Sequence, residues 1–416
     1  MFLRQFKRLT LALLILASLG PGADVLQLNA AQRVALSYEY SLMGWEAGNL
    51  LSKWSHRLAT ALTWNVGPDT NRRSQIHEYF RLAEENRALG AALAEASARL
   101  ENAGSVRRLE SEVAQVNSAR LKLRNDVEEV LEATISAVLV EEDIASWGEL
   151  IFPPVDIRLS NPPRLLVTSP RDRIERTHDV LLDPDVGPRR SGEIERKLMD
   201  RWDLSGLVTP IGGGATYPAS IDGTLALQAT LELAAHEWFH HYLSIRALGR
   251  GLSSSPEMRT LNETMASMVG REIGVDAYER LAGTTDSPAP NVGADPEDIG
   301  EGDEDEFDFA GEMRETRRRG DELLAEGAIQ EAEAYMEERR RLFVDNGFHI
   351  RVLNQAFFAF NGTYAESPAS ISPIADQLHQ FRALTPDLRT FVETMSKVSS
   401  YSQFLGTLDR LVAETP

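Results

Sequence analysis

Cysteine is absent from all 416 residues of the chain. This absence excludes thiol nucleophiles, cysteine-ligated zinc, iron–sulfur clusters and disulfide bonds. Any metal binding or catalysis must therefore use imidazole, carboxylate and hydroxyl groups. The chain contains only eight histidines, so the positions of these residues are informative.

Positive charge is scarce as well. The 43 Lys and Arg residues are outnumbered by 63 Asp and Glu, which gives a net charge of -20. The mean field of such a chain repels phosphate groups, and no basic patch in the sequence offsets it, so we expect no nucleic-acid partner. A charged fraction of 25% and a hydrophobic fraction of 43% are typical of a globular protein.

The sequence also lacks a long hydrophobic run. Three basic residues within the first eight precede an apolar stretch over residues 9–19, which is shorter than the roughly 20 residues of a membrane-spanning helix. This order is typical of a bacterial-type signal peptide, cleaved or kept as an N-terminal membrane anchor; a buried core helix is the alternative. We expect residues 1–23 to place the protein outside the cytoplasm, secreted or membrane-anchored, and residues 24–73 to form a membrane-proximal helical segment.

Residues 74–143 contain no proline and are rich in Ala, Leu, Glu and Arg. Apolar residues recur there at alternating spacings of three and four, which is typical of helices that pack along a seam. A helix-breaking sequence, Ala-Gly-Ser at 103–105, divides the two runs, so the segment predicts an antiparallel coiled-coil hairpin. The hairpin is either a packing spacer or an arm for homodimerisation; a monomeric mass in light scattering would contradict the dimer.

The remaining residues, 150–416, predict an α+β domain in which helices predominate. Short β-rich runs divided by Pro and Gly predict a small sheet, with strands at 155–159, 164–169, 180–182 and 207–211 and one helix at 192–202. After residue 220 the chain is expected to be mostly helical. The exception is 284–308, an acidic insert that cannot bury enough apolar surface to become ordered; a calcium site is the alternative there.

The chemistry is concentrated on one predicted helix, 224–248. It contains the sequence His236-Glu237-Trp238-Phe239-His240. Residues four apart lie on the same face of a helix, so the two imidazoles can bind one metal ion. Glu237 lies beside them, in the position that a general base requires. The alternative is an ordinary pair of surface histidines.

A catalytic zinc site needs a third protein ligand. One known arrangement uses Gly and His three and six residues after the second His, but these positions hold Leu243 and Arg246. The other arrangement uses a Glu on a following helix, and Glu263, within Asn262-Glu263-Thr264, provides one after a Gly- and Ser-rich turn.

Together these residues resemble the gluzincin metallopeptidases, which include thermolysin-like enzymes and one-zinc aminopeptidases, and specifically an uncharacterised bacterial membrane-associated branch. The resemblance implies a zincin-like catalytic domain with a small β-sheet and the HExxH helix. It implies one zinc ion bound by His236, His240 and Glu263, and Glu237 as the catalytic base. The substrate would be a peptide or protein.

The resemblance also implies residues around the metal. Asn262 and Ser267 are expected behind the ligands; Ser267 stands where many gluzincins have an Asp, so metal binding is expected to be weaker. The segment before the HExxH helix is expected to bind the substrate backbone as an added strand, with a flexible turn as the alternative; it comprises Gly213, Gly214, Ala215, Thr216 and Tyr217. Tyr364, or else His349, would stabilise the oxyanion, with ordinary packing as the alternative for both.

The sequence therefore predicts an exported or membrane-anchored zinc-dependent peptidase. The alternative is a catalytically silent, zinc-binding protein with a coiled coil, which would act in assembly or interaction at the membrane surface. Glu237 favours the enzyme, because a silent protein does not need the base. Endopeptidase and aminopeptidase action remain open.

Overall fold

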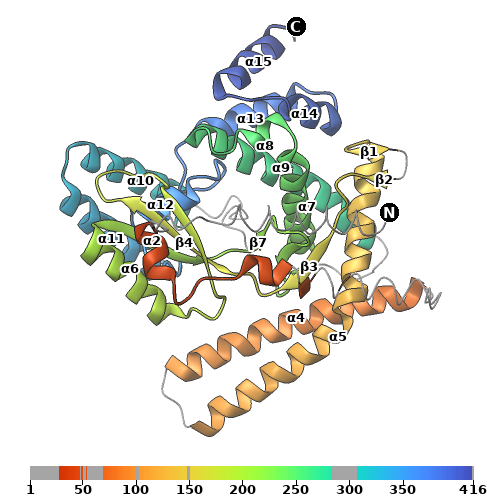
Figure 1. Ribbon diagram of the computed structural model, residues 1–416, viewed down its shortest axis with the longest axis horizontal. Helices are drawn as coiled ribbons and strands as arrows, with labels where there is room; N and C mark the ends of the chain where they lie inside the picture. Colours follow the sequence, from red (N-terminus) through yellow and green to blue (C-terminus); the bar gives the residue numbers. More distant parts are fainter. Residues whose placement is uncertain are drawn as a thin grey trace, which may run out of the picture.

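Helices dominate the computed structural model of the chain, with small β-sheets between them (Figure 1). The structure describes residues 28–46, 48–49, 53, 69–98, 103–147, 150–282 and 307–414. The expected α+β class with predominant helix is confirmed. Residues 1–23 lie outside the described residues, as does the acidic insert except for its last two residues.

The two helices expected in the hairpin are present. They are α4 (Asp69–Ala98) and α5 (Ala103–Glu141), which pack side by side and project from the rest of the molecule (Figure 1). The second half of α5 does not project: Leu131, Ile135 and Leu139 are fully buried in the largest hydrophobic cluster, together with residues of the HExxH helix. The base of the hairpin is therefore part of the main core.

The antiparallel sheet has β4 (Arg164–Pro170) at its centre, between β5 (His178–Leu182) and β6 (Leu204–Pro210). Its hydrophobic residues pack against α6 (Pro188–Trp202) and α2 (Ala30–Ala35) in a cluster of their own. The pattern of short apolar runs predicted these three strands and α6 within a few residues.

The first expected strand belongs to a different sheet, so the prediction of one small sheet was wrong. β3 (Ile157–Ser160) pairs in parallel with β8 (Ala219–Asp222), and β8 pairs with the short edge strand β7 (Gly213–Gly214). β8 was missed because a four-residue strand that follows proline and contains Ser and Asp carries a weak strand pattern. A third, two-stranded sheet joins β1 (Ser146–Trp147) to β2 (Leu150–Ile151).

The rest of the described chain is helical. The HExxH helix is α7 (Leu227–Ser244), which ends four residues earlier than expected because Arg246 is extended and begins the short α8 (Ala247–Arg250). The helices that follow are α9 (Pro256–Ala282), α10 (Phe309–Ala325), α11 (Ile329–Asp345), α12 (Gln355–Asn361), α13 (Ile374–Ala383), α14 (Leu388–Met395) and α15 (Tyr401–Glu414). Among the helices that the structure describes, none has the length and apolar character needed to cross a bilayer.

Two buried carboxylates join the hairpin to the β3 sheet. Glu128 and Glu132 lie one turn apart on α5, and each accepts a hydrogen bond of 2.8 Å from the edge of β3, from Leu159 N–H and Ile157 N–H respectively. They satisfy backbone donors that face away from β8. Lys53 forms buried ion pairs with both carboxylates, so this residue is attached to the same point.

This cluster predicts a pH-dependent stability. Burial raises the pKa of Glu132 to about 7, although the charge of Lys53 acts to lower it. A raised folded-state pKa stabilises the fold below the unfolded-state value, and this stabilisation is lost as pH rises through the folded value. The free energy of unfolding should therefore fall between about pH 4.5 and pH 7, by at most about 3 kcal/mol from this group.

Substitution of Glu132 by Gln should reduce that pH dependence, because the amide stays neutral and its oxygen can still accept from Ile157 N–H. Chemical denaturation over a series of pH values measures the effect. Glu110→Gln, an exposed position on the same helix, is the matched control. An unchanged slope in Glu132→Gln would show that other groups cause it.

Candidate metal centre

The close packing of α7 against α9 creates the site. A Cβ at Gly270 would lie 2.9 Å from the backbone nitrogen of His236, and a Cβ at Gly274 would lie 2.5 Å from the Cα of Glu232. Such distances are shorter than van der Waals contact, so only glycine allows the two helices to approach this closely. The approach brings the α9 face that carries Glu263 next to the histidines of α7.

Three ligand atoms converge between these helices. The distance is 3.0 Å from His236 Nε2 to His240 Nε2, 3.4 Å from His240 Nε2 to Glu263 Oε2, and 3.8 Å from His236 Nε2 to Glu263 Oε2. Ligands at 2.0–2.1 Å in tetrahedral geometry are separated by about 3.4 Å. The three residues form a possible metal-binding triad, with the donor types and spacing that one zinc ion would require.

Ser267 lies behind the triad, one turn after Glu263 on α9. Its hydroxyl donates a hydrogen bond of 3.0 Å to the Glu263 carbonyl and lies 3.5 Å from His236 Nδ1. Because its proton is already donated, the hydroxyl is oriented to accept from that imidazole and to leave Nε2 for a metal.

Asn262 occupies the corresponding place beside His240. Its side chain is almost fully buried, and its interaction with His240 contributes to the raised pKa of that imidazole. Asn262 Oδ1 makes no hydrogen bond of good geometry among the described residues. A buried acceptor of this kind suits an imidazole whose N–H must be held while its other nitrogen binds a metal.

The charges within the triad are strongly coupled. Burial and the neighbouring charge of His240 lower the pKa of His236 to about 3. For His240, burial acts to lower the pKa, but Glu263 outweighs it and the pKa rises to about 9. Burial acts to raise the pKa of Glu263, but His240 outweighs it and the pKa falls to about 2. The imidazole of His236 is therefore neutral and the carboxylate of Glu263 is ionised, so both have a lone pair available for a metal ion between them.

Glu237 lies against the edge strand β7. A Cβ at Gly213 would be 2.6 Å from Glu237 Oε1, so the strand passes this carboxylate at a distance that only glycine permits. Burial raises the pKa of Glu237 to about 7; the charge of His240 acts to lower it, and the charge of Glu263 acts to raise it. The carboxylate is therefore poised to exchange a proton near neutral pH.

The segment after β7 is held by a histidine that the sequence analysis did not assign. His241, next to the ligand His240, donates a hydrogen bond of 2.8 Å from Nε2 to the carbonyl of Thr216, and its ring lies 5.5 Å from that of Tyr217. All five residues expected to bind substrate thus lie in the segment that runs past α7. β7 is at the end of its sheet, so its outer edge is not paired with another described strand.

Tyr364 reaches the triad from the loop after α12. Burial, with the charges of Glu263 and Glu237 and a hydrogen bond to Glu263, raises its pKa well above the ordinary value. The loop is fixed to α9 by a hydrogen bond of 2.9 Å from Ala365 N–H to Thr264 Oγ1. Tyr364 is therefore a protonated donor beside the ligands.

His349, the second candidate for the oxyanion role, is placed differently. It is exposed in the loop between α11 and α12, and none of the interactions described for the triad, Glu237 or Tyr364 involves it. Only the chemistry of its imidazole suits His349 to the role, because position along the chain does not indicate on which side of a helix pair a loop residue will lie.

A positive charge near the triad was also missed. Arg176, between β4 and β5, lies close enough to lower the pKa of both Glu263 and Tyr364, and its guanidinium lies 5.3 Å from the ring centre of Phe360. A single Arg in a polar turn has no sequence pattern that would identify it.

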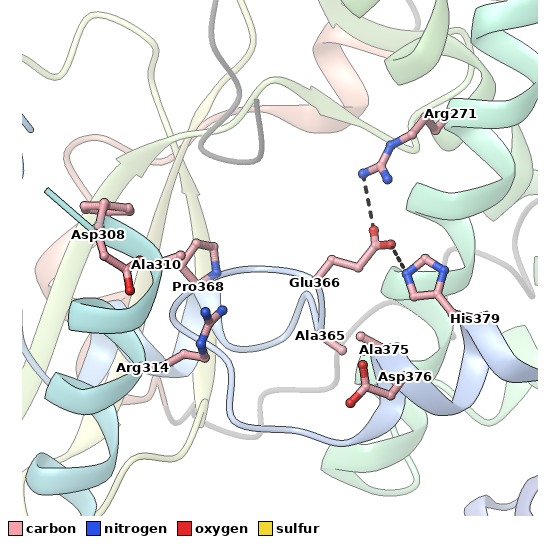
Figure 2. Close-up of a pocket in the computed structure, with 11 residues that line it drawn as sticks. Arg271, Asp308, Ala310, Arg314, Ala365, Glu366, Pro368, Ala375, Asp376 and His379 are labelled. Atoms are coloured by element: carbon pink, nitrogen blue, oxygen red, sulfur yellow. Dashed lines mark hydrogen bonds and ion pairs between the residues drawn. The ribbon is translucent and has the colours of Figure 1, made fainter. Parts of the chain in front are cut away.

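A cavity of about 450 Å³ adjoins the loop of Tyr364. Figure 2 shows Arg271 and His379 reaching Glu366, which lies two residues after Tyr364; the separations are 3.3 Å from Arg271 Nη2 and 2.8 Å from His379 Nε2. Arg271 belongs to α9 and follows Gly270, so one wall of the cavity continues from the helix that carries Glu263. These contacts fix the loop between α12 and α13.

Comparison with known proteins gives no match: no family model, no curated protein and no solved structure resembles the chain significantly.

Proposed function

We propose that the protein is a zinc-dependent peptidase. The observation that carries the proposal is the convergence of His236, His240 and Glu263 with a fourth group, Glu237. Glu237 borders both the triad and an edge of β7 with which no other described strand pairs. A metal-binding role alone would need the three ligands. A carboxylate with a pKa near 7 at the same point adds the proton acceptor that hydrolysis needs.

The fit of the triad to zinc rests on ligand type, spacing and the groups behind the ligands. When bound, zinc would act as a Lewis acid that lowers the pKa of a coordinated water and polarises a peptide carbonyl. Glu237 would accept a proton from the attacking water and deliver it to the leaving amine. Its place in the sequence, one residue after His236, keeps it beside the ligands.

An extended peptide would bind along the outer edge of β7. No other described strand pairs with this edge, and the absence of side chains on Gly213 and Gly214 would let the peptide approach Glu237. His241 positions the following carbonyl of Thr216 and so fixes the course of this edge.

Tyr364 would donate a hydrogen bond to the oxyanion that forms during attack. We predict that Tyr364→Phe lowers kcat by roughly 10²- to 10³-fold, with little change in KM, because the donor acts mainly on the developing charge. Steady-state kinetics with one peptide measures both constants. His349→Ala is the control, and a loss of kcat in that variant comparable to Tyr364→Phe would contradict the assignment.

The proposal is tested with the purified full chain. Zinc content is measured by mass spectrometry, and cleavage of a broad peptide mixture is followed before and after treatment with a chelator and after zinc is restored. We expect one zinc per chain and cleavage that requires it. Bound zinc without cleavage of any peptide would instead support the silent interaction protein. The basic and apolar N-terminus is the basis for proposing an exported or membrane-anchored location.

A further inference from the structure

Two arginines share one aspartate next to the metal-binding triad. Arg176 precedes β5, Asp179 lies within β5, and Arg259 lies in the first turns of α9. Arg259 is four residues before Glu263, so the two side chains leave the same face of the helix one turn apart. The face continues through Ser267 and points toward α7.

The two arginines are not equally engaged. Arg176 contacts Asp179 through Nε at 2.9 and 3.0 Å and through Nη2 at 2.8 Å, and its side chain is 16% exposed. Arg259 approaches the same carboxylate only to 3.7 Å, beyond hydrogen-bond distance, and its side chain is 31% exposed. In the described part of the chain this contact is the one side-chain interaction of Arg259, so its guanidinium retains free donors.

The charge of this group is therefore positive. Two guanidinium groups are balanced by a single carboxylate, which leaves an excess of one positive charge. The group lies beside the reacting centre, because Arg176 acts electrostatically on both Glu263 and Tyr364. The ring of Phe360 bridges the two sides: it lies 5.3 Å from the Arg176 guanidinium and 6.2 Å from the Tyr364 ring.

We propose that Arg259, with Arg176 held in place by Asp179, forms a subsite for a carboxylate of the substrate. A guanidinium binds a carboxylate through two parallel hydrogen bonds, and this geometry makes arginine selective for such groups. The peptidase would prefer peptides that carry an acidic side chain, or the free C-terminal carboxylate, close to the scissile bond. The inference deepens the proposed peptidase function and rests on it.

Matched fluorogenic peptides test this preference. In one series a single position near the cleaved bond carries Glu or Gln, scanned on both sides of the bond, and in the other the C-terminus is free or amidated. For the wild-type protein we expect kcat/KM to be roughly 10- to 100-fold higher with the carboxylate than with the amide. The series in which the difference occurs identifies the source of the carboxylate.

Substitutions then assign the preference to Arg259. Arg259→Gln should bring the ratio of carboxylate to amide substrates near one, and Arg259→Lys should keep part of it, because the charge remains and the planar fork is lost. Arg250→Gln, at an exposed position on α8, should keep the wild-type ratio. A wild-type ratio near one in both series, or a full preference in Arg259→Gln, overturns the subsite.

A binding measurement tests this subsite independently of the proposed hydrolysis. Fluorescence anisotropy measures the affinity of the same peptides for a Glu237→Gln protein, which is not expected to turn them over. If carboxylate peptides bind more tightly than amide peptides, and a second substitution, Arg259→Gln, removes the difference, the subsite is supported. This holds even if the wild-type protein cleaves no peptide; the peptidase proposal would then be contradicted while the subsite stands. Equal binding of carboxylate and amide peptides overturns the subsite even if cleavage is observed.

Discussion

Replacement of Glu237 by Gln is expected to abolish peptide hydrolysis and to leave the zinc content at one ion per chain. The amide has nearly the same shape as the carboxylate, so it fits the narrow space against Gly213, but it cannot accept the proton. Loss of a general base lowers kcat by roughly 10²- to 10⁴-fold. Steady-state kinetics and metal analysis of the same sample measure the two quantities.

The fold should tolerate this change. Glu237 is almost fully buried, and burial disfavours its charge, so a neutral amide at this position avoids the cost of burying a charge. Glu257→Gln, an exposed position at the start of α9, is the matched control and should keep wild-type kinetics. Activity near the wild-type level in Glu237→Gln would exclude this residue as the base.

Replacement of Glu263 by Ala is expected to release the metal. The carboxylate is the one anionic ligand of the triad, and its removal leaves two imidazoles, which are too few to hold a catalytic zinc. Loss of groups behind a ligand already lowers metal affinity by 10- to 100-fold, so loss of a ligand should lower it by more than about 100-fold. Competition with a chromophoric chelator measures the affinity.

The loss of zinc affinity in Ser267→Ala is the reference against which the loss in Glu263→Ala is compared. It removes only the hydroxyl that contacts His236 and the Glu263 carbonyl, so its loss of affinity should stay within about 100-fold. Glu263→Gln serves as a second variant if the alanine protein folds poorly, because it keeps the volume of the side chain. Zinc bound with wild-type affinity in both Glu263 variants would rule out this ligand.

The parts of the site that could be predicted are those determined by the spacing of residues close together in the sequence. Two histidines four apart must share a helix face, and an Asn-Glu pair after a Gly- and Ser-rich turn is placed to fold back on them. Hairpin helices were predictable for the same reason, because their periodicity extends over many residues. In each case the determining information lies within one helix or two consecutive ones.

The parts that could not be predicted depend on contacts between distant segments. β8 is recognisable as a strand only through its pairing with β3, some sixty residues earlier. The Arg176 and Tyr364 side chains reach the triad from loops on either side of it in the sequence, and His349 does not. The chemistry of a side chain shows whether it could serve in the site, whereas the packing of the fold determines whether it lies next to the triad.

The two carboxylates of α5 connect the hairpin to the edge strand β7. Glu128 and Glu132 are bonded to β3, β3 is bonded to β8, and β8 is bonded to β7, which borders Glu237. α5 contains 39 residues and is therefore roughly 60 Å long. A displacement of α5 relative to the β3 sheet is therefore expected to reach the backbone beside Glu237 through three hydrogen-bonded connections.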